Sequence, residues 1–199
     1  MDASTVDSNS TAALSNRPCG ELARSGLLAQ ADFQTVDRLR ELDRINLKII
    51  YRDLAAPAIA DVHAEYGSVM LSQGDRFCTC IVRKLFSCKG PWIGKGFCPI
   101  DRERGQGYNV FGTPDSRKVL LPMDTYIGGS NVVNGAAYIL DYRKRNRGAV
   151  CWLRGELRVL SENLLLGMGT FGPWNPRWAK LRRTIPFLLY RTGPAEPQT

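Results

Sequence analysis

Three consecutive strand-like runs in residues 135–171 constrain the fold of this chain more than any other feature. They read Gly-Ala-Ala-Tyr-Ile-Leu-Asp-Tyr, then Val-Cys-Trp-Leu-Arg-Gly-Glu-Leu-Arg-Val-Leu, then Leu-Leu-Leu-Gly-Met-Gly-Thr-Phe. The middle run alternates apolar and polar side chains, which is the pattern of a strand with one buried face. A basic turn and a Ser-Glu-Asn turn separate the runs, so the stretch is predicted to be an antiparallel meander.

Further short β-type runs lie before and after this meander, at residues 67–71, 77–86, 108–111, 119–127 and 185–190. No helix-length segment alternates with these runs, so a parallel βαβ fold is not expected. About eight or nine short strands favour an antiparallel barrel or a highly curved sheet, because closure removes exposed edges. A barrel of eight strands has an interior that can hold one small ligand.

The part of the chain before the strands has a different pattern. Residues 1–18 are polar and without periodicity, and we predict a disordered tail. Residues 19–65 are predicted to form a helical extension on the barrel: an apolar stripe follows a cap at Asp32 or Thr35, and a second short helix covers residues 58–65. The barrel is expected at residues 66–191 and a loose tail at 192–199. The predicted fold class is α+β, mainly β.

The overall composition is that of an ordinary globular chain, with 44% apolar and 23% charged residues. No run approaches the roughly 20 apolar residues that cross a bilayer, and the polar, acidic start of the chain is unlike a secretory signal. The chain is therefore expected in the cytoplasm, where its six cysteines would be free thiols. Cys78, Cys80, Cys88 and Cys98 match none of the usual zinc spacings, so no metal is predicted.

Motifs of nucleophilic, phosphate-binding or dinucleotide-binding sites are missing from the sequence, and no cofactor is predicted. The single histidine, His63, limits any Ser-His-Asp or multi-histidine site to one histidine from this chain. His63 would act as an acid or base only if it projected into the barrel mouth. A surface position is the commoner outcome.

The run Gly90-Pro91-Trp92-Ile93-Gly94-Lys95 places a Gly-x-Trp motif ahead of antiparallel strands and a late arginine. Together with the run Tyr138-Ile139-Leu140-Asp141-Tyr142 and the two strands after it, this motif resembles the lipocalin-like (calycin) proteins over roughly residues 66–190. The resemblance implies a barrel that binds a small hydrophobic molecule, and some relatives of that class are isomerases or cyclases. The chain departs from the family pattern because strand-like segments precede Trp92 and helices are added.

The candidate acid–base groups lie inside predicted strands: Asp124, Tyr126, Asp141 and Glu156. A strand carboxylate that points into an apolar barrel would have a raised pKa and could exchange protons near neutral pH. Asp141 alternates with Tyr138 and Tyr142, so either the carboxylate or the two tyrosines should line the cavity.

The candidate ligand-binding residues are aromatic or basic: Trp92, Tyr138, Tyr142, Trp152, Arg154 and Arg158. Arg154 and Arg158 flank Glu156 at two residues' distance and could cradle an anionic group. The alternative is a row of alternating charges on the outside of the sheet.

The sequence leaves three functional hypotheses open. The first is a barrel that encloses a small, largely hydrophobic molecule. The second is a cofactor-independent isomerase, cyclase or dehydratase that uses an interior carboxylate and tyrosine. The third follows from the net charge of +8 and two basic clusters, 143–147 and 177–183, which could associate with a membrane surface or a nucleic acid.

Overall fold

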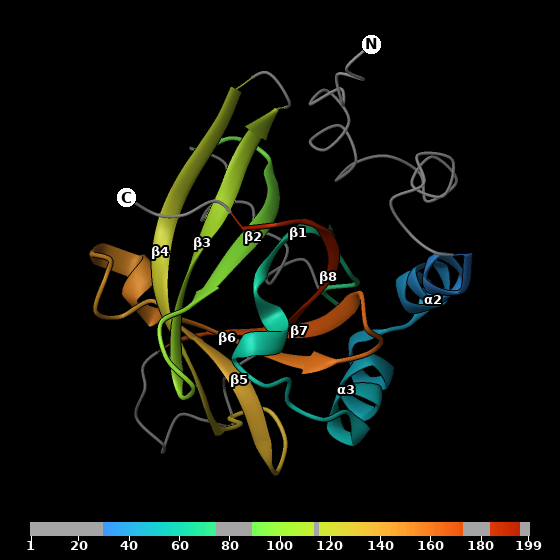
Figure 1. Cartoon of the computed structure of the whole chain (residues 1–199). Helices are drawn as coiled ribbons and strands as arrows, with labels where there is room; N and C mark the ends of the chain where they lie inside the picture. Colours follow the sequence, from blue (N-terminus) through green and yellow to red (C-terminus); the bar gives the residue numbers. More distant parts are fainter. Residues whose placement is uncertain (1–29, 75–88, 114–115, 173–183, 196–199) are drawn as a thin grey trace, which may run out of the picture.

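A closed barrel of eight antiparallel strands forms the body of the protein in the computed structural model, which describes residues 30–74, 89–113, 116–172 and 184–195 (Figure 1). Each strand pairs with the next along the chain, and β8 pairs back with β1 to close the ring. The strands are β1 (Ala64–Met70), β2 (Trp92–Pro99), β3 (Arg104–Thr113), β4 (Ser116–Gly129), β5 (Ala136–Asp141), β6 (Leu153–Val159), β7 (Leu164–Phe171) and β8 (Thr184–Gly193).

The antiparallel meander expected over residues 135–171 is confirmed as β5, β6 and β7. Two boundaries differ from the sequence prediction. Residues 150–152 belong to a 3-10 helix, η4 (Gly148–Trp152), so β6 begins only at Leu153. The run predicted at 108–111 is longer at its start, because β3 begins at Arg104 after a turn capped by the Asp101 carboxylate. The run at 77–86 lies outside the described residues.

The interior of the barrel is an apolar core to which alternate residues of nearly every strand contribute. The core includes Tyr66 of β1, Phe97 of β2, Met123 of β4, Leu157 of β6 and Leu189 of β8. Their sequence neighbours point outward, as the period-2 geometry of strands requires. The 3-10 helix η3 (Ala60–Val62) adds Val62 to this core and closes the barrel at the end where β1 begins.

The two helices pack against the outside of the barrel and lie on one side of it in Figure 1. α2 (Gln30–Glu41) contributes Val36 and Leu39, and α3 (Arg44–Asp53) contributes Leu47 and Tyr51, to a second core with outward residues of β1, β7 and β8. The apolar stripe therefore faces the sheet, as expected for an amphipathic helix. Within the described residues, no helix has both the length and the apolar character needed to span a membrane.

The helical stripe is divided into two helices rather than one. The break is at Asp43, whose carboxylate accepts a hydrogen bond of 2.8 Å from the Asn46 amide and so caps α3. The second short helix predicted over residues 58–65 reduces to the single turn η3, because β1 already begins at Ala64.

Aromatic rings lie directly over glycines on neighbouring strands. Tyr190 of β8 faces Gly67 of β1, and Phe187 of β8 faces Gly167 of β7, each pair being cross-strand partners. A Cβ atom at Gly67 would be 2.2 Å from the Tyr190 ring, and a Cβ atom at Gly167 would be 2.2 Å from the Phe187 ring. The glycines thus provide the space in which these buried rings pack flat against the sheet.

The replacement Gly67→Ala should lower the free energy of unfolding by about 1–3 kcal/mol, because the buried Tyr190 ring must move away from the new methyl group. Urea unfolding measures this loss. Gly129→Ala is the matched control, since no heavy atom lies within 4 Å of its added Cβ. Equal stability of the two variants would contradict the packing described here.

Candidate functional site

The interior of the barrel is divided into a filled half and a half that contains a cavity. Near the end closed by η3, the rings of Tyr66, Phe97 and Tyr138 pack edge to face with centroids 5.7 Å apart for each neighbouring pair. The Tyr138 hydroxyl donates a hydrogen bond of 2.9 Å to Thr125 Oγ1, so its polar end is satisfied. This half is ordinary close-packed core.

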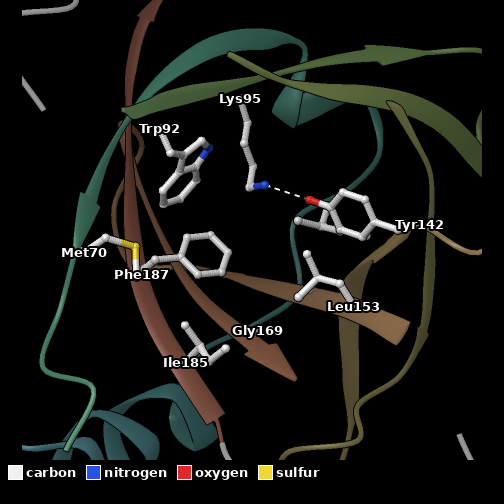
Figure 2. A pocket seen from close by; sticks show the side chains of 10 residues that line it. Met70, Trp92, Lys95, Tyr142, Leu153, Gly169, Ile185 and Phe187 are labelled. Atoms are coloured by element: carbon white, nitrogen blue, oxygen red, sulfur yellow. Dashed lines mark hydrogen bonds between the residues drawn. The ribbon is translucent and has the colours of Figure 1, made fainter. Parts of the chain in front are cut away.

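The cavity lies toward the opposite end, and Figure 2 shows the side chains around it. Its volume is about 40 Å³, measured as the space that the centre of a water-sized sphere can occupy. That is room for roughly three waters. Ten residues from six strands and their ends line it: Met70, Trp92, Lys95, Leu140, Tyr142, Leu153, Gly155, Gly169, Ile185 and Phe187. Met70 is 37% exposed, so the cavity reaches the surface beside this flexible side chain.

Two glycines create the space on one wall of the cavity. Gly155 of β6 and Gly169 of β7 are directly paired and face the interior, so neither strand contributes a side chain at this level. The Trp92 and Phe187 rings form another part of the wall, and they meet edge to face with centroids 5.6 Å apart. The result is an apolar slot with aromatic walls, which is typical of small-molecule sites.

One basic side chain, Lys95 of β2, enters this apolar slot. Its Nζ donates hydrogen bonds of 2.5 Å to Asn109 Oδ1 and 2.8 Å to the Tyr142 hydroxyl oxygen. Asn109 is held in turn, since its Nδ2 donates to the Leu121 carbonyl (3.1 Å) and to the Tyr142 hydroxyl oxygen (3.2 Å). Figure 2 shows the Lys95 amine directed across the cavity toward Tyr142.

Lys95 is only 4% exposed, and burial lowers its pKa from 10.5 to about 7. Aromatic rings offset part of the cost of burying the charged amine, because Nζ lies 5.0 Å from the centroid of the Trp92 ring and 5.7 Å from that of the Phe187 ring. No carboxylate of the described residues forms an ion pair with it. Burial also raises the pKa of Tyr142 above its usual value, so the phenol stays protonated at neutral pH.

This arrangement has specific chemical consequences. Near neutral pH the amine exists in both protonation states, so it can bind an oxygen acceptor as an ammonium or attack an electrophile as a free amine. The phenol beside it can donate or return a proton over 2.8 Å.

Of the six residues predicted to bind a ligand, two line the cavity and four do not. Trp92 and Tyr142 are part of its wall, and Tyr138 lies in the filled half of the interior. Trp152 is 52% exposed at the end of η4 and contacts Phe171 outside the cavity lining. Arg154 and Arg158 lie on the outer face of β6, since the inward positions of that strand are Leu153, Gly155 and Leu157.

The outer network around Glu156 joins the helices and a loop to the barrel. The fully buried Glu156 carboxylate accepts hydrogen bonds from Ser130 Oγ, from the Asn131 amide at 2.7 Å and from Arg154 Nε at 3.2 Å. Arg158 donates to four backbone carbonyls, those of Tyr51, Arg52, Leu54 and Asn134. The alternating charges therefore lie outside the barrel, but they are buried beneath α3 and the β4–β5 loop.

The predicted acid–base residues Asp124, Tyr126 and Asp141 come together in a groove on the outer wall of the barrel. Asp124 and Asp141 are cross-strand partners on β4 and β5. Asp124 pairs with Arg145, and Asp141 pairs with Arg143. Burial acts to raise the pKa of Asp141, but its hydrogen bonds with Arg143 outweigh that effect and hold the pKa below its usual value.

Tyr138 of β5 and Tyr142, directly after that strand, therefore belong to the interior core, whereas Asp141 points outward. The groove is larger than the interior cavity, about 340 Å³ by the same measure, but charged side chains from Arg104, Lys144 and Arg145 also line it. Its chemistry does not suit an apolar molecule. Arg143 and Arg145 form ion pairs with Asp141 and Asp124, which partly neutralise their positive charges. The 143–147 cluster is therefore a weaker surface for anionic partners.

Sequence reasoning missed Lys95 as a site residue. The available signal was a lysine inside the run Trp-Ile-Gly-Lys-Gly-Phe, where it shares the inward parity of Phe97 two residues later. A bulge between Trp92 and Gly94 hides that parity, because it brings Trp92 inward as well. The informative basic residue was Lys95, which stands alone in an apolar strand, and not the two basic clusters.

Comparison with known proteins identifies the fold only. No family model matches the sequence. No curated protein matches it either. A solved structure described as a protein from Thermomonospora curvata is similar to this chain, with a TM-score of 0.51 and 17% identity over 81% of this chain and 96% of that chain. A likeness at this identity supports the barrel architecture and carries no function.

The other features considered in the sequence analysis are His63, the cysteines, the N-terminal tail and the second basic cluster. The backbone carbonyl of His63 accepts a hydrogen bond from Arg191, and the histidine follows η3 at the closed end of the barrel, away from the cavity. Cys98 and Cys151 are partly buried, and the Cys151 thiol donates a hydrogen bond of 2.8 Å to the Asn146 carbonyl. Cys78, Cys80, Cys88, the tail 1–18 and the basic cluster 177–183 lie outside the described residues.

Proposed function

We propose that this barrel binds a small, largely apolar molecule of the lipocalin-ligand type, with one polar oxygen of the ligand placed against Lys95. The observation that carries the proposal is the amine itself. A buried lysine without a carboxylate partner among the described residues destabilises the fold, so its presence in the lining of an apolar cavity fits a ligand that compensates it.

The lining supports a ligand with an apolar body and a single polar end. Apart from Lys95 and the Tyr142 hydroxyl, the side chains around the cavity are apolar or glycine. The volume admits only a few heavy atoms beside Lys95, so a longer ligand must extend past Met70 toward the surface. The interior carries no Asp or Glu in its described lining, which favours binding over the carboxylate-dependent enzyme hypothesis.

The test combines native mass spectrometry of the protein from its own source with a titration of the purified protein by butanoate. A stoichiometric small molecule, or saturable butanoate binding, is the expected result. Gly169→Ala should weaken binding at least tenfold, because the added methyl group enters the cavity while its nearest neighbour, Ile185 Cβ, lies at an ordinary 3.4 Å. Gly129→Ala, on an exposed strand end, should bind like the wild type.

An apo mass together with no butanoate binding would contradict the proposal. Equal binding by Gly169→Ala and Gly129→Ala would place the ligand elsewhere and would contradict it equally. Binding that disappears at high salt in both glycine variants would instead favour the basic surface clusters.

A further inference from the structure

We infer that the cavity is built to capture a small aldehyde or ketone as an imine on the Lys95 amine. This inference rests on the proposed function, because it names the reactive group of the ligand at the same site. Three features of the described residues carry it: the direction of the amine, the group beside it and the surroundings of both.

The first feature is that the amine is presented to the cavity and held in place. Nζ is fixed by Asn109 Oδ1 at 2.5 Å and by the Tyr142 hydroxyl at 2.8 Å, and the Lys95 side chain is part of the cavity lining. A carbonyl carbon that entered past Met70 would meet the amine at the inner end of the slot. Holding a nucleophile in one orientation removes much of the entropic cost of the addition step.

The second feature is that no carboxylate of the described residues forms an ion pair that would hold the amine as an ammonium. The compensation comes instead from two neutral hydrogen bonds and from the rings of Trp92, Tyr142 and Phe187. Burial lowers the pKa of Lys95 to about 7, so close to half of the amine is free at neutral pH. An ordinary surface lysine is free in less than about one molecule in a thousand at that pH.

The third feature is the phenol beside the amine. In the addition step, the nitrogen lone pair forms the C–N bond, the carbonyl π pair moves to oxygen, and one N–H proton is transferred to that oxygen. The Tyr142 hydroxyl then donates its proton as the C–O bond breaks, and the oxygen leaves as water. The phenolate recovers the remaining N–H proton, which yields a neutral imine, and no oxidant or reductant is consumed.

The apolar walls favour the imine once it has formed. Hydrolysis requires water at the imine carbon, and the described lining offers no polar side chain other than Lys95 and Tyr142 to hold one there. Lys48, Lys118 and Lys144 lie outside the interior, in α3, β4 and the β5–β6 loop, and form no such enclosed pair with a phenol.

The experiment is reductive trapping with butanal and sodium cyanoborohydride at pH 7, read by intact-protein and peptide mass spectrometry. One butyl group on Lys95 is expected, formed at least a hundredfold faster than on any other lysine. Prior butanoate should protect Lys95, since both probes occupy the same cavity. Lys95→Met should lose the adduct.

Tyr142→Phe separates nucleophilic capture from simple occupancy. This variant keeps the amine and the ring but removes the proton donor, so the trapping rate measured at saturating butanal should fall at least tenfold. Butanoate binding without selective trapping of Lys95 would overturn the imine inference and leave the proposed function standing. Failure of both binding and trapping would remove both.

Discussion

Lys95 should make the free energy of unfolding of this protein depend on pH, by on the order of 4 kcal/mol, and Lys95→Met should remove that dependence. Burial lowers the pKa of Lys95 to about 7 in the folded chain, whereas the unfolded chain retains 10.5. Between these values the unfolded state binds one more proton at Lys95 than the folded state. The free energy of unfolding of the wild type therefore rises with pH across that window, by up to about 1.4 kcal/mol per pH unit.

The destabilising effect of Lys95 is fully present at and below pH 7 and disappears by about pH 10.5. The titratable side chain that faces the amine in the described interior is Tyr142, which stays protonated over most of this range. The stability gained by Lys95→Met should thus be largest near pH 7 and should shrink steadily as the pH rises.

Urea unfolding of both proteins at several pH values measures this difference. Lys118→Met, on the exposed part of β4, controls for the general effect of replacing a lysine with methionine. A difference between Lys95→Met and the wild type that stays constant from pH 7 to pH 10 would show that the amine is not buried as described.

Arg158→Met should lower the free energy of unfolding by about 3–5 kcal/mol, which is a large fraction of the stability of a domain of this size. The guanidinium of Arg158 donates to the carbonyls of Tyr51, Arg52 and Leu54 at the C-terminal end of α3. It also lies 5.1 Å from the centroid of the Tyr51 ring. The replacement would remove this donor from the carbonyls at the helix end and would leave that end without its compensating charge.

Arg52→Met is the matched control, because the Arg52 side chain is exposed and, within the described residues, pairs with the exposed Asp53. Its stability should change by less than about 1 kcal/mol. If Arg158→Met unfolds at the same urea concentration as the control, Arg158 does not hold α3 on the barrel, and its sequence-based assignment to ligand binding regains weight.

The sequence predicted the architecture well because strand periodicity is local. Alternation over residues 150–160 and short turns around it determine strands and their order, and many short strands in sequence favour closure. The helical boundaries were less predictable. One apolar stripe continues across Asp43, and only the capping hydrogen bond to Asn46 shows where the second helix begins.

The candidate site was less predictable because it depends on which face of each strand is inward. Tyr138 and Asp141 were equally good candidates until the outward pairing of Asp141 with Arg143 was known. Arg154 and Arg158 have the residue types of an anion site, yet their partners are a buried carboxylate and backbone carbonyls from residues far away in the sequence. Such long-range partners leave no periodic signal.

The most direct test of the account is a nuclear magnetic resonance titration of the Lys95 side chain, assigned by its absence in Lys95→Met, with and without saturating butanoate. We expect a midpoint near pH 7 for the free protein. Butanoate should raise that midpoint by at least one pH unit, because a bound carboxylate stabilises the ammonium form. A midpoint near 10.5 in the free protein, or one that butanoate does not move, would contradict the claim that this barrel presents a buried amine to its ligand.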